Sequence, residues 1–263
     1  MHNHLSPHQI DAYLLRIGLK EPPEANLQGL KSLHRAQFFH IPFENLNIRL
    51  GRGVSLDPET VFEKLVTDRR GGYCFELNGL MLRALRSFGF DARALLARVH
   101  LGDEPSGKTH QLNLVHLPEG DWTIDVGFGA GGPQFVLPLS EGTFTDERAS
   151  YRLSMEAPWG WMMRTLDDGT WKDSYSFSTA HVTAADIEMG NHYTSTSPNS
   201  HFTQISTVSL PTASGRISLR DLQWTEWAGD RKTTRMLEPI EFVQVLDHRF
   251  GINIPHPPPF SQS

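Results

Sequence analysis

Cysteine is nearly absent from this chain of 263 residues, in which Cys74 is the single thiol. One thiol excludes an intramolecular disulfide and any metal site built from several thiolates. No apolar run approaches the roughly 20 residues that a membrane-spanning helix needs. The first ten residues lack a basic stretch followed by an apolar one, so we expect no signal peptide. The composition therefore predicts a cytoplasmic protein.

The chain also has no excess of basic over acidic residues. The chain has 24 Lys and Arg against 30 Asp and Glu, which gives a formal net charge of -6. A protein that binds nucleic acid through phosphate contacts needs a basic excess, so we expect neither nucleic acid nor a membrane as a partner. Hydrophobic residues make up 38% of the chain, which is ordinary for a globular protein, and the length allows two or three subdomains.

Helical spacing of apolar residues dominates the first ninety residues. The segment Ser6–Gln9 has the form of a capping box with proline at the first helical position, and Gly18 is a natural helix end. The spacing predicts three further helices: one that carries Leu27, Leu30 and Leu33, one that starts at Asp57-Pro58, and one from Cys74 to Phe88.

From Ala92 the apolar period changes to two, which predicts strands. We expect a hairpin of residues 110–116 and 122–128, with turn residues at Pro118–Asp121. A polar stretch, Asn191–Asn199, interrupts the β pattern. Other strands are predicted at 93–99, 151–155, 161–166, 171–177, 203–210 and 216–224, and a last helix near 239–250.

Cys74 is a candidate nucleophile because of where it stands. It follows Arg70-Gly71-Gly72-Tyr73 at the predicted start of a helix. A helix N-terminus favours negative charge and therefore increases the thiolate fraction of a cysteine. The alternative is a small buried hydrophobic residue, which free cysteines usually are. Position alone does not separate the two interpretations.

A thiolate nucleophile needs a base and an orienting group, for which His110 and Asp125 are candidates. The two residues share a face of the predicted hairpin. An aspartate between Ile124 and Val126 in a strand is out of place without a partner. However, a turn at 118–121 pairs His110 with about residue 129, so the pattern predicts a shared face and no contact. A satisfied strand histidine is the more frequent situation for a lone His.

The nine residues Arg70–Asn78 resemble the nucleophile segment of the arylamine N-acetyltransferases. Further segments agree with that family in the same order: His40–Leu46, Thr109-His110, Asp125–Gly129 and Ser197–Phe202. The resemblance spans nearly the whole chain, and chance agreement in this order is negligible.

The resemblance implies an α+β fold in three parts: a helical bundle (1–90) that carries the nucleophile, a β-barrel-like domain (91–195) that carries His and Asp, and an α/β lid (196–263). The core is expected to be cysteine-protease-like, with Cys74, His110 and Asp125 as the catalytic triad. The implied reaction transfers an acetyl group from acetyl-CoA to the nitrogen of arylamines, arylhydrazines or arylhydroxylamines. It is a ping-pong reaction through a Cys74 thioester.

The resemblance also implies binding residues. Thr109, Gly127, Phe128, Gly129 and Phe202 are expected to contact acetyl-CoA, which is a co-substrate and not a permanently bound cofactor. An acceptor pocket is expected from Phe38, Tyr73, Val99, Phe128 and Phe202, and structural support from an ion pair of Glu44 and Arg70. Ordinary core packing or a plain turn is the alternative at most of these positions. No metal is expected, the partners are the arylamine and the acyl-CoA donor, and a homodimer is a possible assembly.

Other functions share parts of this pattern. An amide synthase with the same triad joins a polyketide or other long acyl chain to an aromatic amine. A cysteine hydrolase transfers the acyl group to water. A non-catalytic binding module with a degenerate triad is poorly supported, because all three triad positions are filled.

Overall fold

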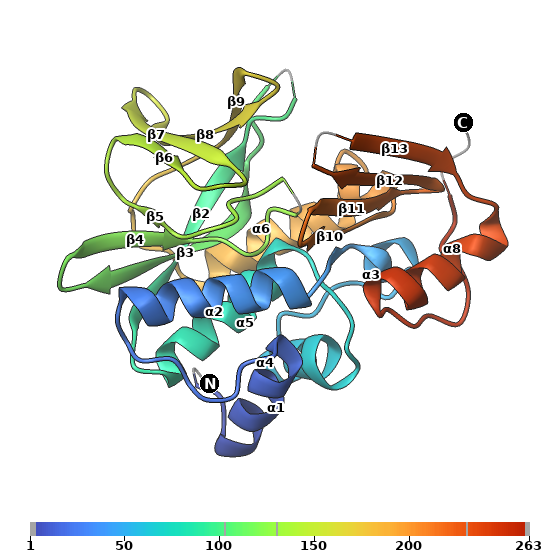
Figure 1. Cartoon of the computed structure of the whole chain (residues 1–263), viewed down its shortest axis with the longest axis horizontal. Helices are drawn as coiled ribbons and strands as arrows, with labels where there is room; N and C mark the ends of the chain where they lie inside the picture. The colour runs from blue at the N-terminus through green and yellow to red at the C-terminus, as the bar shows by residue number, and fades with distance from the viewer. Residues whose placement is uncertain (1–3, 103, 130, 230, 261–263) are drawn as a thin grey trace.

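The computed structural model describes residues 4–102, 104–129, 131–229 and 231–260. Figure 1 shows an N-terminal group of helices, a barrel of strands above it, and a separate sheet beside both. This α+β architecture agrees with the fold class predicted from the sequence. The helical group contains α1 (Pro7–Ile17), α2 (Leu27–His40), α3 (Leu46–Arg49), α4 (Pro58–Phe62), the π-helical turn η1 (Glu63–Thr67) and α5 (Cys74–Ser87).

Within the described residues, eight antiparallel strands form one sheet that curls into a nearly closed barrel. Their order across the sheet is β5-β4-β3-β2-β9-β8-β7-β6. The strands are β2 (Asp91–Val99), β3 (Lys108–Leu117), β4 (Gly120–Ile124), β5 (Leu137–Pro138), β6 (Gly142–Thr145), β7 (Ser150–Glu156), β8 (Gly160–Asp167) and β9 (Thr170–Phe177).

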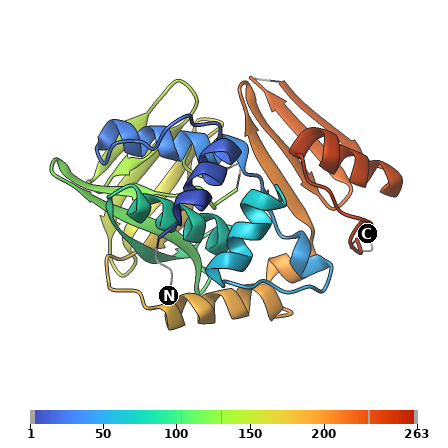
Figure 2. The same cartoon turned by 90° about the horizontal axis from the view of Figure 1, so that it is seen from below.

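The C-terminal sheet has the order β1-β10-β11-β12-β13, and α8 lies on its outer face in Figure 2. Its first strand, β1 (Phe43–Glu44), comes from the N-terminal segment, so this sheet is tied to the helical group. The remaining elements are α6 (Ala184–Thr196), α7 (His201–Gln204), β10 (Thr207–Thr212), β11 (Gly215–Arg220), β12 (Gln223–Ala228), β13 (Arg231–Met236), α8 (Pro239–Val245) and the π-helical turn η2 (Leu246–Phe250).

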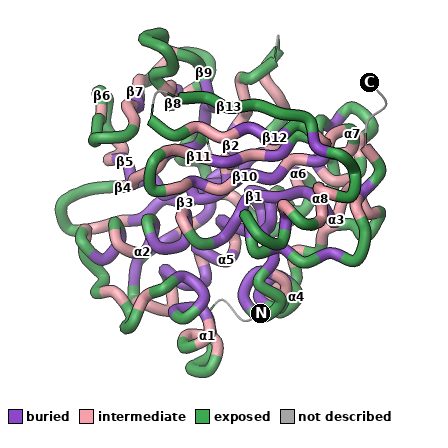
Figure 3. Tube along the Cα trace, turned by 45° about the vertical axis from the view of Figure 1, so that its right-hand side comes forward, coloured by how far each residue is buried: buried purple, intermediate pink, exposed green. Residues whose placement is uncertain are grey.

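Local signals explain the helices that the sequence predicted. Ser6 and Gln9 form the capping box at the start of α1, and Gly18 ends that helix at a φ of 76°. α5 begins at Cys74 as predicted and carries Leu77, Leu80 and Leu85 into the main core, all at most 1% exposed. Figure 3 shows α5 as a buried element with strands and helices around it. The nucleophile candidate therefore stands on the most enclosed helix of the N-terminal group.

Three strand predictions are wrong in their extent. The strand expected at 122–128 ends at Ile124, and the segment expected at 203–210 begins with α7. The segment expected at 216–224 is two strands, because Asp221 adopts a left-handed φ of 47° and reverses the chain. Aspartate tolerates this conformation, so the turn needs no glycine.

The polar stretch Asn191–Asn199 is not predicted to be helical, yet its first six residues belong to α6. The helix starts at Thr183, whose hydroxyl accepts a hydrogen bond from the N–H of Asp186, while the Asp186 carboxylate accepts one from the N–H of Thr183. Among the described residues, no helix is long and apolar enough to cross a membrane. The division at 1–90, 91–195 and 196–263 stays a prediction.

Replacement of glycine by alanine should have opposite effects on stability at two glycines inside helices. A Cβ on Gly79 in α5 meets no atom within 4 Å, whereas one on Gly29 in α2 meets the carbonyl oxygen of Glu24 at 1.9 Å. We expect Gly79→Ala to raise the free energy of unfolding by about 0.5–1 kcal/mol, because alanine restricts the unfolded chain more than glycine. Gly29→Ala is expected to lower it. Urea unfolding measures both, and a loss of stability in Gly79→Ala contradicts the open space beside that residue.

Candidate active site

Cys74 is the first residue of α5 and is only 3% exposed. The turn before it is held by the Glu76 carboxylate, which accepts a hydrogen bond from the N–H of Tyr73 at 3.1 Å. Sγ lies 3.7 Å from the backbone oxygen of Thr109 in β3. The thiol therefore lies at the start of a helix, where the first N–H groups have no partner within the helix, and against strand β3 of the barrel.

His110 and Asp125 are in direct contact, which corrects the prediction made from the hairpin register. Nε2 of His110 lies 2.7 Å from Oδ2 of Asp125, and both side chains are at most 3% exposed. In the hairpin, Asn113 pairs with Ile124, and there the ladder ends. Because Asp125 is released from the strand, its side chain is no longer restricted to the position that the register dictates.

Asp125 is fixed on every side by hydrogen bonds. Its Oδ1 accepts from Nδ2 of Asn78 and from the N–H of Gly127, both at 2.9 Å. Its backbone oxygen accepts from Nε2 of His34 at 3.1 Å, and burial lowers the pKa of that histidine to about 4, so its ring is neutral. Burial opposes the charge of Asp125, but His110 and these donors lower the pKa of its carboxyl overall.

The ring of His110 faces both the carboxylate and the thiol. Asp125 occupies Nε2, which leaves Nδ1 for a second partner, and the Cys74 side chain hydrogen-bonds to this ring. Burial alone lowers the pKa of His110, but Asp125 and Cys74 outweigh it and raise the pKa to about 10. The electrostatics therefore favour an imidazolium next to the Cys74 side chain.

Close packing between α5 and the segment after β4 holds these groups together. A Cβ on Gly127 stands 2.7 Å from Cα of Cys74 and 2.6 Å from Nδ2 of Asn78. Only glycine allows this approach, because real Cβ atoms do not come so near to backbone. The same close packing lets Oδ1 of Asn78 accept a hydrogen bond from the N–H of Val126 at 3.1 Å.

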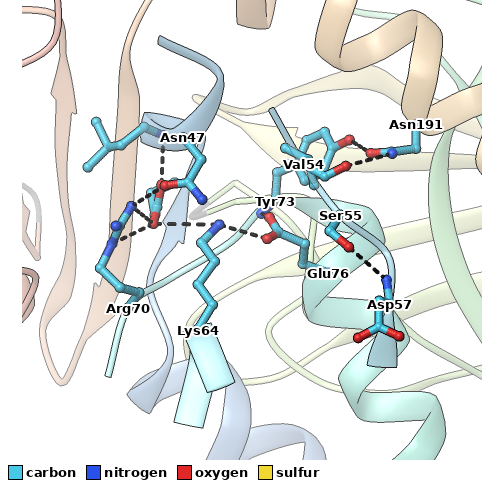
Figure 4. A network of polar contacts seen from close by, with 11 residues as sticks. Asn47, Val54, Ser55, Asp57, Lys64, Arg70, Tyr73, Glu76 and Asn191 are labelled. Atoms are coloured by element: carbon cyan, nitrogen blue, oxygen red, sulfur yellow. Dashed lines mark hydrogen bonds and ion pairs between the residues drawn. The ribbon is translucent and has the colours of Figure 1, made fainter. Parts of the chain in front are cut away.

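A buried network of charges supports the start of α5, as Figure 4 shows. Nη2 of Arg70 lies 2.6 Å from Oε1 of Glu44, and both residues are at most 8% exposed at their side chains. Nζ of Lys64 lies 2.7 Å from Glu76 and 3.9 Å from Glu44. Burial raises the pKa of Glu76, and Lys64 opposes that rise. The network connects the helix turn that carries Cys74 with β1.

The comparisons with known proteins agree with this site. Residues 26–257 match the family model described as N-acetyltransferase. The arylamine N-acetyltransferase of Escherichia coli is 34% identical over 93% of this chain and 89% of its own. The chain belongs to the arylamine N-acetyltransferase family. It is therefore an acyltransferase.

Solved structures of the family have the same fold. The arylamine N-acetyltransferase from Salmonella typhimurium matches with a TM-score of 0.89 and 32% identity, and the match covers 95% of this chain and 92% of that one. The Mycobacterium marinum enzyme in complex with CoA matches with a TM-score of 0.87 and 31% identity over 93% of each chain.

Some binding residues expected from the arylamine N-acetyltransferase resemblance lie beside the thiol and the imidazole. The Phe128 ring is 5.0 Å from the His110 ring, edge to face. Phe202 lies 6.0 Å from Tyr73, the residue before Cys74. Thr109 is half-buried, with its backbone oxygen 3.7 Å from Sγ of Cys74, and Gly129 adopts a positive φ of 81°.

Other expected pocket residues are enclosed by protein. Phe38 is 4% exposed and stacks on His34 at 5.4 Å. Tyr73 is fully buried, and its hydroxyl donates to Oδ1 of Asn191 in α6. Val99 is half-buried at the end of β2. Within the described residues, no three His, Cys, Asp or Glu side chains gather as metal ligands would.

The sequence reasoning missed three residues that contact the triad candidates. Asn78 stands one turn after Cys74, so the i, i+4 spacing was a usable signal for a shared helix face. His34 and Tyr175 gave no such signal, because they reach Asp125 and His110 from α2 and β9. The Tyr175 ring lies 5.1 Å from that of His110, and burial raises the pKa of its phenol.

Gly127→Ala tests the close approach of the two segments. We expect a loss of about 1–3 kcal/mol in the free energy of unfolding, as overpacked sites usually show, together with a marked loss of acetyltransferase activity. Gly131→Ala is the matched control, since a Cβ there meets no atom within 4 Å. Equal stability and activity in the two variants refute the proposed steric role of Gly127.

Arg70→Met tests the buried network. It leaves the Glu44 carboxylate with the N–H of Leu46 and, as its one remaining cation among the described residues, Lys64 at 3.9 Å. We therefore expect a loss of about 3–5 kcal/mol in the free energy of unfolding. The control is Arg235→Met, which breaks an exposed pair with Glu241 and should cost less than about 1 kcal/mol. Urea unfolding of both proteins decides the matter, and equal losses contradict the structural role of the network.

Proposed function

We propose that this acyltransferase moves an acetyl group from acetyl-CoA to the nitrogen of arylamines, arylhydrazines or arylhydroxylamines. The observation that carries the proposal is the chain's only thiol, at the start of α5, beside an imidazole that a buried carboxylate holds at 2.7 Å. Cys74 is then the nucleophile, and His110 is the general acid and base. Asp125 orients the imidazole and stabilises its protonated form.

In the first half-reaction, the thiolate Sγ of Cys74 attacks the thioester carbonyl of the donor. The new S–C bond forms, the bond between the acetyl carbon and the CoA sulfur breaks, and the leaving CoA takes a proton from His110. The raised pKa of His110 supports this step, since it keeps the proton available at neutral pH. The products are free CoA and acetyl-Cys74.

In the second half-reaction, the amine nitrogen attacks the acetyl carbon of acetyl-Cys74. His110, now neutral, accepts the proton that the nitrogen loses, and the C–S bond of the thioester breaks. Release of the amide restores the thiolate and the imidazolium, so the balance of protons closes. Asp125 holds the imidazole in one tautomer through both steps.

The binding residues belong to the same proposal. We place the acetyl-CoA arm along Thr109, Gly127, Phe128, Gly129 and Phe202, and the arylamine against Phe128 and Phe202, with Tyr73, Val99 and Phe38 behind them. The aromatic contacts of Phe128 and Phe202 with the site support this placement. The C-terminal part would act as a lid over a cysteine-protease-like core, and the CoA complex of the Mycobacterium marinum relative supports a CoA donor.

Intact-protein mass after mixing with acetyl-CoA, without an amine, tests the first half-reaction. We expect the wild type to gain the mass of one acetyl group and Cys74→Ala to gain none. Parallel reactions with longer acyl-CoAs separate an acetyltransferase from an amide synthase, and rapid loss of the adduct in water indicates a hydrolase. An adduct on Cys74→Ala, or none on the wild type, contradicts the proposed thioester.

The pH dependence of Cys74 alkylation tests the ion pair. Because the raised pKa of His110 keeps an imidazolium beside Sγ up to about pH 10, alkylation by iodoacetamide should remain fast well below pH 7. His110→Ala removes this cation, so its rate profile should move toward that of a free thiol, with a midpoint near about 8.5. A wild-type midpoint near that value shows that the resting enzyme holds no such pair.

A further inference from the structure

A cavity lies along α5, beside residues of α4 and α6. Its volume is about 610 Å³, which is in the range of small-molecule sites, and its walls come from the loop before α4, from α4, α5 and α6, and from β3. Neither Cys74, His110 nor Asp125 lines it. Figure 2 shows α6 running below α5 and the strands.

Two glycines explain why this space is open. Gly190 brings α6 into close contact with the protein, since a Cβ there stands 2.9 Å from both the Lys108 backbone oxygen and the Phe75 ring. Gly79, on the facing helix α5, leaves the space beside it empty, because a Cβ there would meet no atom within 4 Å. The cavity is therefore closed at the Phe75 end and unfilled along α5. Its apolar wall consists of Leu56, Pro58, Val61, Leu80, Leu82 and Ile187.

A polar side chain without a partner among the described residues faces this apolar space. Gln111 lines the cavity and is 2% exposed, and its side-chain amide makes no hydrogen bond to any residue that the structure describes. Arg83 also lines the cavity, but its terminal nitrogens are paired with the backbone oxygen of Pro58 and the carboxylate of Glu59. Polar groups inside proteins nearly always have a partner, so Gln111 points to a molecule that supplies one.

Arg86 supplies a positive charge at the far end of the cavity and has no hydrogen-bonded carboxylate among the described residues. Arg86 donates from Nε to the backbone oxygen of Ala92 at 3.1 Å, while within the described residues its two terminal nitrogens have no acceptor. The acidic residues of the rim do not fill this role. Asp57 accepts two hydrogen bonds from Thr60 at the start of α4, and Glu188 is exposed on α6. From Phe75 to Arg86 the helix rises by about 16 Å, which sets the length of the occupant.

We propose that this cavity is a second binding site, separate from the acyl-transfer site, for an arylalkanoic acid. The apolar body lies between α5 and α6, the carboxylate is bound by the two terminal nitrogens of Arg86, and Gln111 pairs with a polar substituent at the other end. Charge-assisted hydrogen bonds from guanidinium groups are among the strongest that a carboxylate can receive in a protein.

Calorimetric titration with 4-phenylbutanoate tests this site in the full chain. Cys74 is first alkylated with iodoacetamide, so that binding beside the thiol does not contribute. We expect one equivalent to bind, and the uncharged analogue 4-phenylbutan-1-ol to bind at least about fivefold more weakly, because it offers no charge to Arg86. Absence of binding at millimolar concentration, or equal affinity for the two compounds, overturns the proposal.

Variants at Gly79 locate the binding. Gly79→Leu fills the cavity and should weaken binding at least about tenfold, whereas Gly79→Ala adds one methyl group and should change it less than about threefold. Arg86→Gln should weaken binding of the acid and leave that of the alcohol unchanged. If Gly79→Leu does not fold, Ile187→Trp fills the same space from α6. Unchanged affinity in a folded cavity-filling variant refutes this location.

Discussion

The buried contact between His110 and Asp125 is the interaction on which the rest of the site depends. Two charges at about 3% exposure are costly to remove from water, and they persist only when every remaining polar atom has a partner. Asp125 meets this condition with donors from two other segments, Asn78 in α5 and His34 in α2, and from Gly127 in its own segment. One carboxylate therefore positions the imidazole and also joins the barrel to the helical group.

α5 is the element through which this constraint reaches the thiol. Its first turn carries Cys74, its second carries Asn78, and Gly127 packs against both. Glu76 of the same helix begins the charge network that runs through Lys64 and Glu44, and the strand that contains Glu44 pairs with β10 of the C-terminal sheet. The helix start is thus braced from the barrel on one side and from the C-terminal sheet on the other.

Much of this arrangement could be predicted from the sequence wherever a local signal was strong. The capping box at Ser6 and the start of α5 are examples, since backbone hydrogen bonding near a helix end depends on a few adjacent residues. Helix α6 was not predicted from the sequence, because its surface is polar. The one local signal for it is the capping box that Thr183 and Asp186 form at its start. The contact of His110 with Asp125 could not be deduced from hairpin register, because the ladder stops at Ile124. Family resemblance named the pair, and the geometry supplies the reason that it can form.

The protonation state of His110 tests the account most directly. Nitrogen-15 NMR of histidine-labelled protein, with His110 assigned by its loss in His110→Gln, reports whether one or both ring nitrogens carry a proton. We predict that both remain protonated at pH 8 and that the ring loses a proton only near pH 10. In Asp125→Asn the transition should fall toward the ordinary histidine value of about 6.5. A wild-type ring that titrates near that value would contradict the buried ion pair as the organising interaction of the site.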